Sequence, residues 1–125
     1  MSRTIYVSPT RAILSDPTDP KAGGMAHLYP VTGMYIDGSA CDGPAGDIGQ
    51  VKFQHGPVKE VGVNGLQHAD LYRILIDRLE CAQAGPFACE ENAAQLVLLQ
   101  RALASDEART SRRVQAGTEG LHKGV

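Results

Sequence analysis

Hydrophobic positions in the second half of the chain recur with the period of an α-helix. From Leu66 onward, apolar side chains lie three and four residues apart, which places them on one face of a helix. Gly85 and Pro86 then supply a C-terminal cap residue and a stop for this first helix. Its predicted apolar stripe consists of Leu71, Ile74, Leu75, Leu79 and Ala82.

A second helix is predicted to begin near Cys89, because Glu90 and Glu91 place negative charge where a helix dipole starts. No Gly or Pro interrupts it before Gly117, so it should run for roughly 25 residues, or about 38 Å. Two helices joined by a short turn predict an antiparallel hairpin over residues 66–116. The predicted apolar stripe of this second helix is Ala93, Leu96, Leu99, Ala102 and Leu103.

The first 60 residues have a different pattern, with eight of the 14 Gly and six of the seven Pro. This density of turn residues excludes long helices there and favours short strands in a small antiparallel sheet. Surface loops are expected at Ser15–Gly24 and Asp37–Gly49. The four predicted strands are Thr4–Val7, His27–Tyr29, Met34–Ile36 and Val51–Gln54.

These patterns predict an α+β fold in which a small N-terminal antiparallel β-sheet is followed by a C-terminal antiparallel helical hairpin. We expect a single domain of residues 1–125, with a β-rich part (1–60), the hairpin (66–116) and a C-terminal tail (117–125). Val97 and Leu98 widen the apolar surface of the second helix, which favours a homodimer whose two hairpins form a four-helix bundle. Packing of the hairpin on the protein's own sheet is the alternative.

Composition supports one modest core, since 42% of the 125 residues are hydrophobic. Only 5% are aromatic and Trp is absent, which suits a core of Leu, Ile, Val and Ala. No apolar run approaches the roughly 18 residues that span a bilayer, and the N-terminus lacks the apolar stretch of a signal peptide, so we expect a soluble intracellular protein. The three cysteines form no CxxC pair and are predicted to be small buried hydrophobes.

The net charge of −2 is unevenly distributed, because residues 101–125 carry five basic and three acidic side chains. Arg109, Arg112 and Arg113 are spaced i, i+3 and i+4, so Arg109 and Arg113 project from one helix face. Two guanidinium groups there could clamp phosphates, since each pairs bidentately with phosphate oxygens. Stabilisation of the helix dipole by cations near the C-terminus is the alternative for the same residues.

Two further elements could contact a nucleotide. The Gly62–Gly65 segment (GVNG) precedes the first helix and could meet an anion, although a tight turn in which Asn64 caps the helix is favoured. Phe87 and Asn92 flank the start of the second helix and offer an aromatic face for a base and an amide for its edge. A hydrophobic plug at Phe87 and a backbone cap at Asn92 are the structural alternatives.

Catalytic constellations are missing from the sequence. The four histidines show no paired ligand spacing, and there is no GxSxG, HExxH or acidic metal cluster. Binding is therefore favoured over turnover, with no metal and no cofactor expected. Two competing hypotheses remain: a nucleic-acid-binding or virion assembly module using the same arginines, and a hydrolase or lyase using Glu90, Glu91 or His122. The lack of an extended basic surface weighs against nucleic acid.

Several strings together resemble the phage Thoeris anti-defence sponge family, type one. They are GPVKEVGVNGL at 56–66, DRL at 77–79, GPFACEEN at 85–92, Arg109 with Arg113, and GTEGLHK at 117–123. The resemblance covers about residues 52–125, and the hairpin is also similar to that of the anti-CBASS sponge of type two. Gln67 to Asp70 depart from the family pattern, in which an Asn-Glu pair is common.

The resemblance implies a protein that captures glyco-cyclic ADP-ribose, the messenger of TIR enzymes, without cleaving it, in the cytoplasm of the infected bacterial host. It implies a pocket between two protomers in which Phe87 stacks adenine, Asn92 fixes an edge or ribose, and Arg109 and Arg113 hold the diphosphate. It further implies a homodimer and a hexamer built as a trimer of dimers. Separate sites for CBASS cyclic trinucleotides would then be bordered by Gly117, Thr118 and His122.

Overall fold

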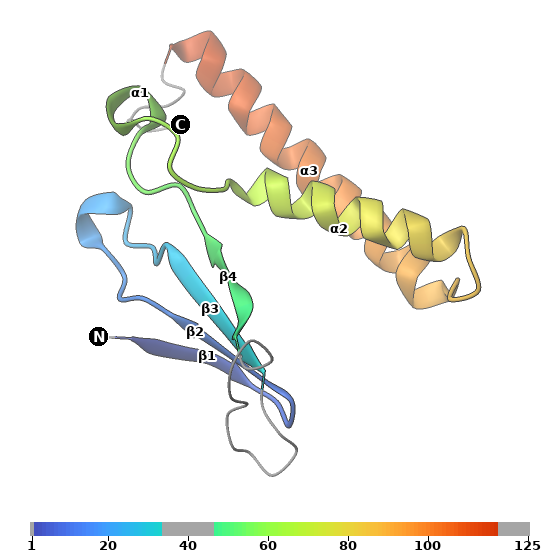
Figure 1. Cartoon of the computed structure of the whole chain (residues 1–125). Coiled ribbons are helices and arrows are strands. Elements are labelled where there is room, and N and C mark those ends of the chain that lie inside the picture. The colour runs from blue at the N-terminus through green and yellow to red at the C-terminus, as the bar shows by residue number, and fades with distance from the viewer. Residues whose placement is uncertain (1, 34–46, 118–125) are drawn as a thin grey trace. The chain divides into compact units, whose positions relative to one another are not determined.

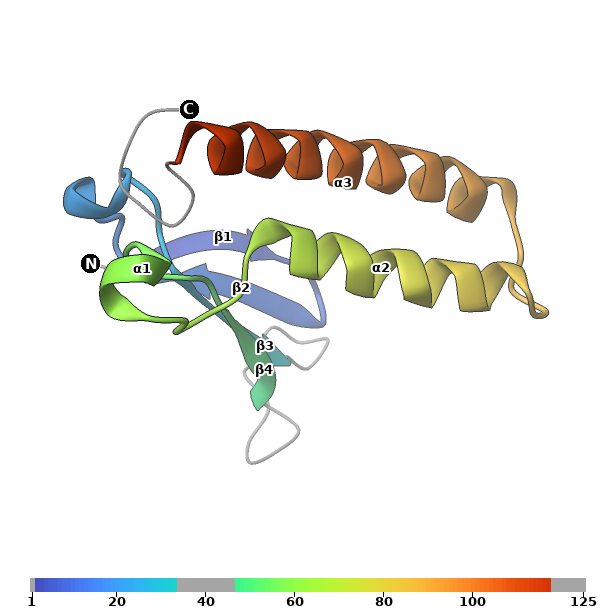
Figure 2. The same ribbon diagram turned by 90° about the horizontal axis from the view of Figure 1, so that it is seen from above.

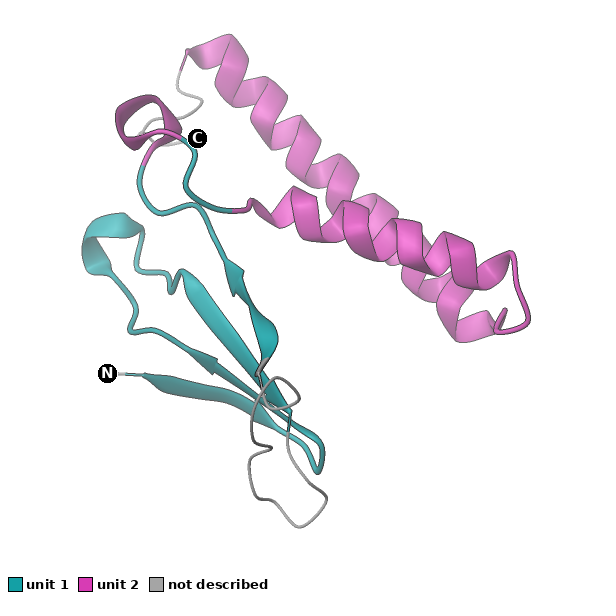
Figure 3. Cartoon of the chain, in the orientation of Figure 1, with its two compact units in different colours: residues 1–56, 63–65 teal, residues 57–62, 66–125 magenta. Residues whose placement is uncertain are grey.

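The computed structural model describes residues 2–33 and 47–117. The chain forms two compact units, shown in teal and magenta in Figure 3. The first unit contains residues 1–56 and 63–65, and the second contains residues 57–62 and 66–125. The division falls close to the predicted change from β-rich to helical sequence, while folding of the whole chain as a single domain stays a prediction.

The first unit is built on a four-stranded antiparallel sheet (Figure 1). Its strands are β1 (Arg3–Val7), β2 (Arg11–Ser15), β3 (Leu28–Gly33) and β4 (Asp47–Lys52), and their order in the sheet is the order in the chain. Each strand pairs antiparallel with the next. The predicted α+β fold, with an N-terminal antiparallel sheet followed by C-terminal helices, is therefore confirmed.

The individual strands agree only in part with the prediction. β1 confirms Thr4–Val7, β3 overlaps His27–Tyr29, and β4 overlaps Val51–Gln54. The predicted strand Met34–Ile36 lies outside the described residues. The predicted loop Asp37–Gly49 is wrong at its end, because residues 47–49 pair with β3 as the first half of β4.

Strand β2 was not predicted, and a tight reversal explains its position. The Ser8 N–H donates to the Arg11 carbonyl at 2.8 Å, and the Ser8 hydroxyl accepts from the Arg11 N–H at 3.0 Å. These bonds turn the chain back so that β2 pairs with β1. β2 in turn pairs with β3, across the loop of residues 16–27.

The second unit contains α1 (Val58–Val61), α2 (His68–Gln83) and α3 (Glu90–Ala116). The short helix α1 was not predicted. α2 and α3 pack side by side as an antiparallel hairpin (Figure 2), as the sequence indicated for residues 66–116. In the part of the chain that the structure describes, no helix is both long and apolar enough to cross a membrane.

The helix ends correct two details of the sequence analysis. Asn64 does not cap α2; instead, Gln67 and Asp70 form a reciprocal capping box, with the Gln67 N–H donating to Asp70 at 2.8 Å. At the other end, Ala84 is the C-cap, and Gly85 follows it without a positive φ. Gly117 ends α3 in the left-handed conformation, with φ of 71°.

The hairpin buries little of its apolar surface by itself. Leu79, Leu96, Leu99 and Leu103 are half-buried between the helices. Ile74 and Leu75 were predicted to belong to the packed stripe of α2, but both are exposed. Among the described residues, the buried hydrophobic side chains are Ala22, Ala26 and Ala69, so the larger aliphatic side chains of the hairpin keep contact with solvent.

Candidate functional site

Two side-chain amides hold the turn at the tip of the hairpin. Gln83 clamps the turn by accepting from the Cys89 N–H at 2.9 Å and donating to the Cys89 carbonyl at 3.1 Å. Asn92 reaches back from the first turn of α3 and donates from Nδ2 to the Phe87 carbonyl at 3.2 Å. The tip is therefore a fixed element with backbone geometry set by its own polar side chains.

Phe87 is presented to solvent by this turn, with 79% of its surface exposed. It does not plug the ends of the helices, which was the structural alternative for this residue. Asn92, in contrast, does bond the local backbone through Nδ2, and its Oδ1 accepts no hydrogen bond from the residues that the structure describes. An exposed aromatic ring beside an anchored amide can stack on a planar base and bind its edge.

Arg109 and Arg113 lie one turn apart near the end of α3, as predicted, but their surroundings differ. Arg109 is exposed, whereas Arg113 is buried to 5% exposure and its carbonyl accepts from the Gly117 N–H that caps the helix. The positive charge at this end also suits the helix dipole. Arg109 is therefore the more accessible of the two guanidinium groups for an anion.

The two halves of the predicted site lie at opposite ends of α3. Asn92 and Arg109 are 17 positions apart on one continuous helix, which corresponds to roughly 26 Å along its axis. Phe87 lies still further from the arginines along the hairpin. One chain thus offers two separate groups of candidate residues, and the structure does not bring them together within a protomer.

Most of the residues predicted to border the second site, the one for cyclic trinucleotides, lie outside the described residues. Gly117 is described as the left-handed cap of α3. Thr118 and His122 lie outside the described residues. The assignment of this segment to a cyclic trinucleotide therefore stays a prediction.

The Gly62–Gly65 segment has a structural role within the first unit and its junction with α1. The Asn64 side chain pairs with both backbone groups of His55, through Oδ1 and Nδ2 at 2.8 Å each. Gly65 packs so closely on Phe53 that a Cβ atom there would lie 2.4 Å from the Phe53 carbonyl carbon. These contacts explain the Asn and the second Gly of the motif without a bound anion.

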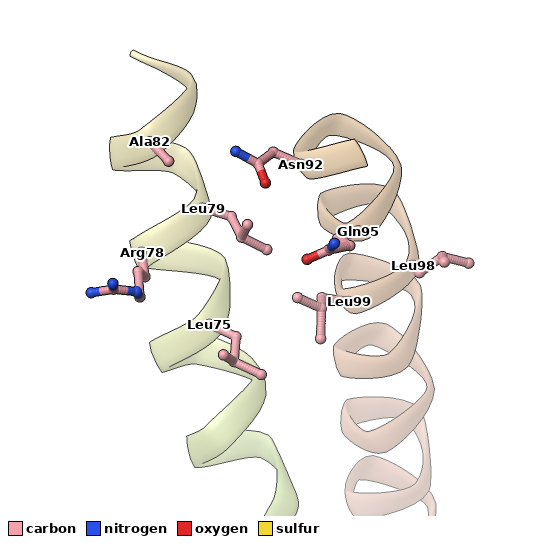
Figure 4. A pocket seen from close by; sticks show the side chains of 8 residues that line it. All are labelled: Leu75, Arg78, Leu79, Ala82, Asn92, Gln95, Leu98 and Leu99. Carbon is pink, nitrogen blue, oxygen red and sulfur yellow. The ribbon is translucent and has the colours of Figure 1, made fainter. Parts of the chain in front are cut away.

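Sequence analysis missed a groove between α2 and α3 with a volume of about 580 Å³ (Figure 4). Asn92 lies in it, together with two polar residues that were not proposed as site residues, Arg78 and Gln95. The signal available in the sequence was the DRL string at 77–79, in which Arg78 has uncharged residues at i±3 and i±4. The remaining lining residues are Leu75, Leu79, Ala82, Leu98 and Leu99.

A histidine cluster in the first unit was also missed. The ring of His27 is buried and stacks on that of His55, whose Nε2 lies 2.9 Å from the Asp19 Oδ2. This contact lowers the pKa of Asp19 below 3.8, with the Lys21 N–H adding to the effect. The pKa of Asp16 is lowered chiefly because its Oδ1 accepts from the His27 N–H at 2.9 Å.

Two of the three cysteines contradict the prediction of buried hydrophobes. Cys81 and Cys89 are both exposed near the hairpin tip, where they have no core to fill. Cys41 lies outside the described residues. Within residues 2–33 and 47–117, no three His, Cys, Asp or Glu side chains gather as they would to hold a metal ion.

These features define a small α+β protein with an exposed aromatic tip, an apolar groove and a basic end on one helical hairpin. Comparison with known proteins adds a relative: the chain is 43% identical over 79 residues to "Thoeris anti-defense 1" of Bacillus phage SBSphiJ7. The match covers 63% of this chain and 56% of that relative, so the chain spans little more than half the relative's length.

The resemblance to the type one Thoeris anti-defence family is thereby confirmed. No protein-family model matches the chain. The similarity of the hairpin to the anti-CBASS sponge stays a prediction.

Proposed function

We propose that this protein is a phage anti-defence sponge that sequesters glyco-cyclic ADP-ribose made by TIR enzymes and so blocks Thoeris immunity. The observation that carries the proposal is its 43% identity with a phage protein named Thoeris anti-defense 1. The messenger is held without being cleaved, inside the infected bacterial cell. Tight sequestration requires nanomolar affinity or better, or about 12 kcal/mol of binding free energy.

The candidate side chains of the hairpin suit the parts of such a ligand. Phe87 stacks on the adenine, and Asn92, anchored to the turn by its Nδ2, accepts from a base edge or ribose hydroxyl through Oδ1. Arg109 and Arg113 bind the diphosphate through charge-assisted hydrogen bonds. Because Arg109 is exposed and Arg113 is buried, an arriving diphosphate meets the Arg109 guanidinium first, while the Arg113 side chain is held more rigidly by its surroundings.

The separation along α3 supports a pocket shared by two copies. Roughly 26 Å between Asn92 and Arg109 is too long for one compact cyclised nucleotide to bridge within a chain. Two antiparallel α3 helices from a homodimer would bring the tip of one copy to the basic end of the other. The exposed Val97 and Leu98, midway between, supply apolar surface for that contact.

The proposal also includes assembly of three dimers into a hexamer with separate sites for cyclic trinucleotides of CBASS. Gly117, Thr118 and His122 would border those sites. The support for this part is the GTEGLHK string at 117–123 and its family resemblance.

The test is capture and release. Purified protein is mixed with glyco-cyclic ADP-ribose and retained on a size filter, and the retained fraction is heat-denatured and assayed for intact ligand by liquid chromatography with mass detection. Intact ligand recovered only after denaturation is the expected result. Conversion of the ligand to a new chemical species would show that the protein is an enzyme and not a sponge. Ligand that passes through the filter unbound and unchanged would refute the proposal, and cyclic trinucleotides and then nucleic acid would be tested next.

A further inference from the structure

The groove between α2 and α3 combines an apolar floor with three polar side chains. In Figure 4, Leu79 and Ala82 of α2 face Asn92 and Leu99 of α3 across the groove, while Arg78 lines its α2 edge and its guanidinium extends away from α3. Its volume of about 580 Å³ falls within the range of roughly 300–1,000 Å³ that small-molecule sites occupy. An apolar surface with a few convergent polar groups is the usual form of such a site.

Arg78 is an uncompensated cation in this setting. Its neighbours one turn away on α2 are uncharged, and none of the residues that the structure describes forms a hydrogen bond or ion pair with it. Arg73, five positions earlier on α2, instead has Glu107 at 3.5 Å. The neighbours at i±3 and i±4 from Arg78 are Ile74, Leu75, Cys81 and Ala82.

Gln95 is the second polar group of the groove without a partner among residues 47–117. Figure 4 shows its amide on the side of α3 that faces α2, one turn from Asn92. The Asn92 amide is fixed by its bond to the Phe87 carbonyl, while that of Gln95 stays able to donate and accept. The two amides and the guanidinium therefore offer several donors and two acceptors over aliphatic side chains.

This combination fits an anion with an apolar, hydrogen-bonding body. A guanidinium beside aliphatic side chains is weakly hydrated and pairs bidentately with a phosphate. The leucines provide surface for a sugar or a base, and the amides bind hydroxyl and ring polar atoms. A second hairpin seated in the groove would instead have to supply an acidic side chain to Arg78.

We propose that Arg78 is a phosphate-binding residue of the ligand site and that Gln95 binds the adjoining sugar or base, both in the groove beside Asn92. The inference rests on the proposed function and adds a cation supplied by the same chain as Phe87 and Asn92. Phosphate contact is then not confined to the arginines at the far end of α3.

The test compares Arg78→Ala, Arg78→Lys and Gln95→Ala with the wild-type protein by calorimetric titration of glyco-cyclic ADP-ribose at low and high salt. Arg78→Ala is expected to weaken binding by about 10- to 100-fold and to reduce its salt dependence, since one charge-assisted contact is lost. Arg78→Lys should recover part of the affinity, because it restores the charge without the planar fork. Gln95→Ala should lose a smaller factor and keep the salt dependence.

Lys59→Ala is the matched control, because Lys59 is an exposed cation of α1 that does not line the groove. Tight wild-type binding with an unchanged Arg78→Ala variant would overturn the proposal and leave the sponge function standing. A wild-type protein that binds no messenger would refute the proposed function itself. If Arg78→Ala changes the molar mass of the free protein by light scattering, Arg78 contacts a second copy and the proposal is also overturned.

Discussion

The imidazole rings of His27 and His55 stack face to face, with their centroids 4.0 Å apart and their planes within 4° of parallel. The pair joins the loop before β3 to the segment after β4, residues 28 positions apart in the chain. Asp19 contacts the His55 ring at Nε2. The buried Nδ1 of His27 has no hydrogen-bond partner among the described residues. The stacked rings and the Asp19 contact therefore tie these two segments of the first unit together.

Acid is therefore expected to destabilise the sheet unit. The pKa values of Asp16 and Asp19 are lowered in the folded protein, so each carboxylate contributes stability above pH 3.8 that is lost as pH falls through the lowered value. Thermal unfolding followed by circular dichroism from pH 7 to pH 2.5 should show this loss. Asp16→Asn should lower the melting temperature at pH 7 and make it fall less steeply as the pH is lowered. A variant whose melting temperature falls with pH as steeply as that of the wild type would contradict this account.

Gly65→Ala is expected to destabilise the protein by about 1–3 kcal/mol, because its Cβ would meet the backbone of Phe53 at 2.4 Å. Backbone atoms cannot move aside as a flexible side chain can. Gly85→Ala is the matched control, since the nearest atom to its Cβ is 3.7 Å away. Equal melting temperatures for the two variants would show that the contact relaxes without cost.

The two long helices, α2 and α3, could be predicted from the sequence because their signals are local. The three-and-four spacing from Leu71 to Leu103 and the uninterrupted run to Gly117 identify the hairpin, and α3 ends at that Gly. Strand β2 has no comparable signal, since its five residues become a strand only by pairing with β1 and β3. The same holds for residues 47–49, whose pairing with β3 outweighs their turn-like composition.

The candidate site was predictable in part for the same reason. Phe87 and Asn92 stand beside a recognisable turn, and Arg109 and Arg113 have a helical spacing, so sequence locates them on the hairpin. Their exposure is a property of packing, and nothing in the spacing indicated that Arg113 is buried while Arg109 is exposed. The groove could not be predicted in this way, because its position depends on which faces of α2 and α3 meet.

Leu98→Asp is expected to convert the proposed homodimer into a monomer. Leu98 is 62% exposed on α3, and a carboxylate at the centre of an apolar contact between copies would be desolvated at a cost of several kcal/mol. Size-exclusion chromatography with light scattering measures the change. Gln100→Glu, at another exposed position of α3, is the control, and a Leu98→Asp variant with the wild-type molar mass would place the contact elsewhere.

Phe87→Ala is expected to reduce messenger affinity without affecting folding. With 79% of its surface exposed, Phe87 contributes little to packing, so the melting temperature of the free protein should stay within about 1 °C of wild type. Stacking of one base on an aromatic ring contributes about 1–3 kcal/mol, so the dissociation constant should rise by about 5- to 150-fold.

Phe87→Tyr separates stacking from a general effect of the substitution, because it keeps the aromatic face and should retain most of the affinity. Calorimetric titration with glyco-cyclic ADP-ribose gives the affinity, and thermal unfolding without ligand gives the stability. If both variants bind as wild type does, the exposed ring does not hold the adenine. If both lose stability instead, Phe87 is packed in the assembled protein and its exposure in the single chain marks a contact between copies.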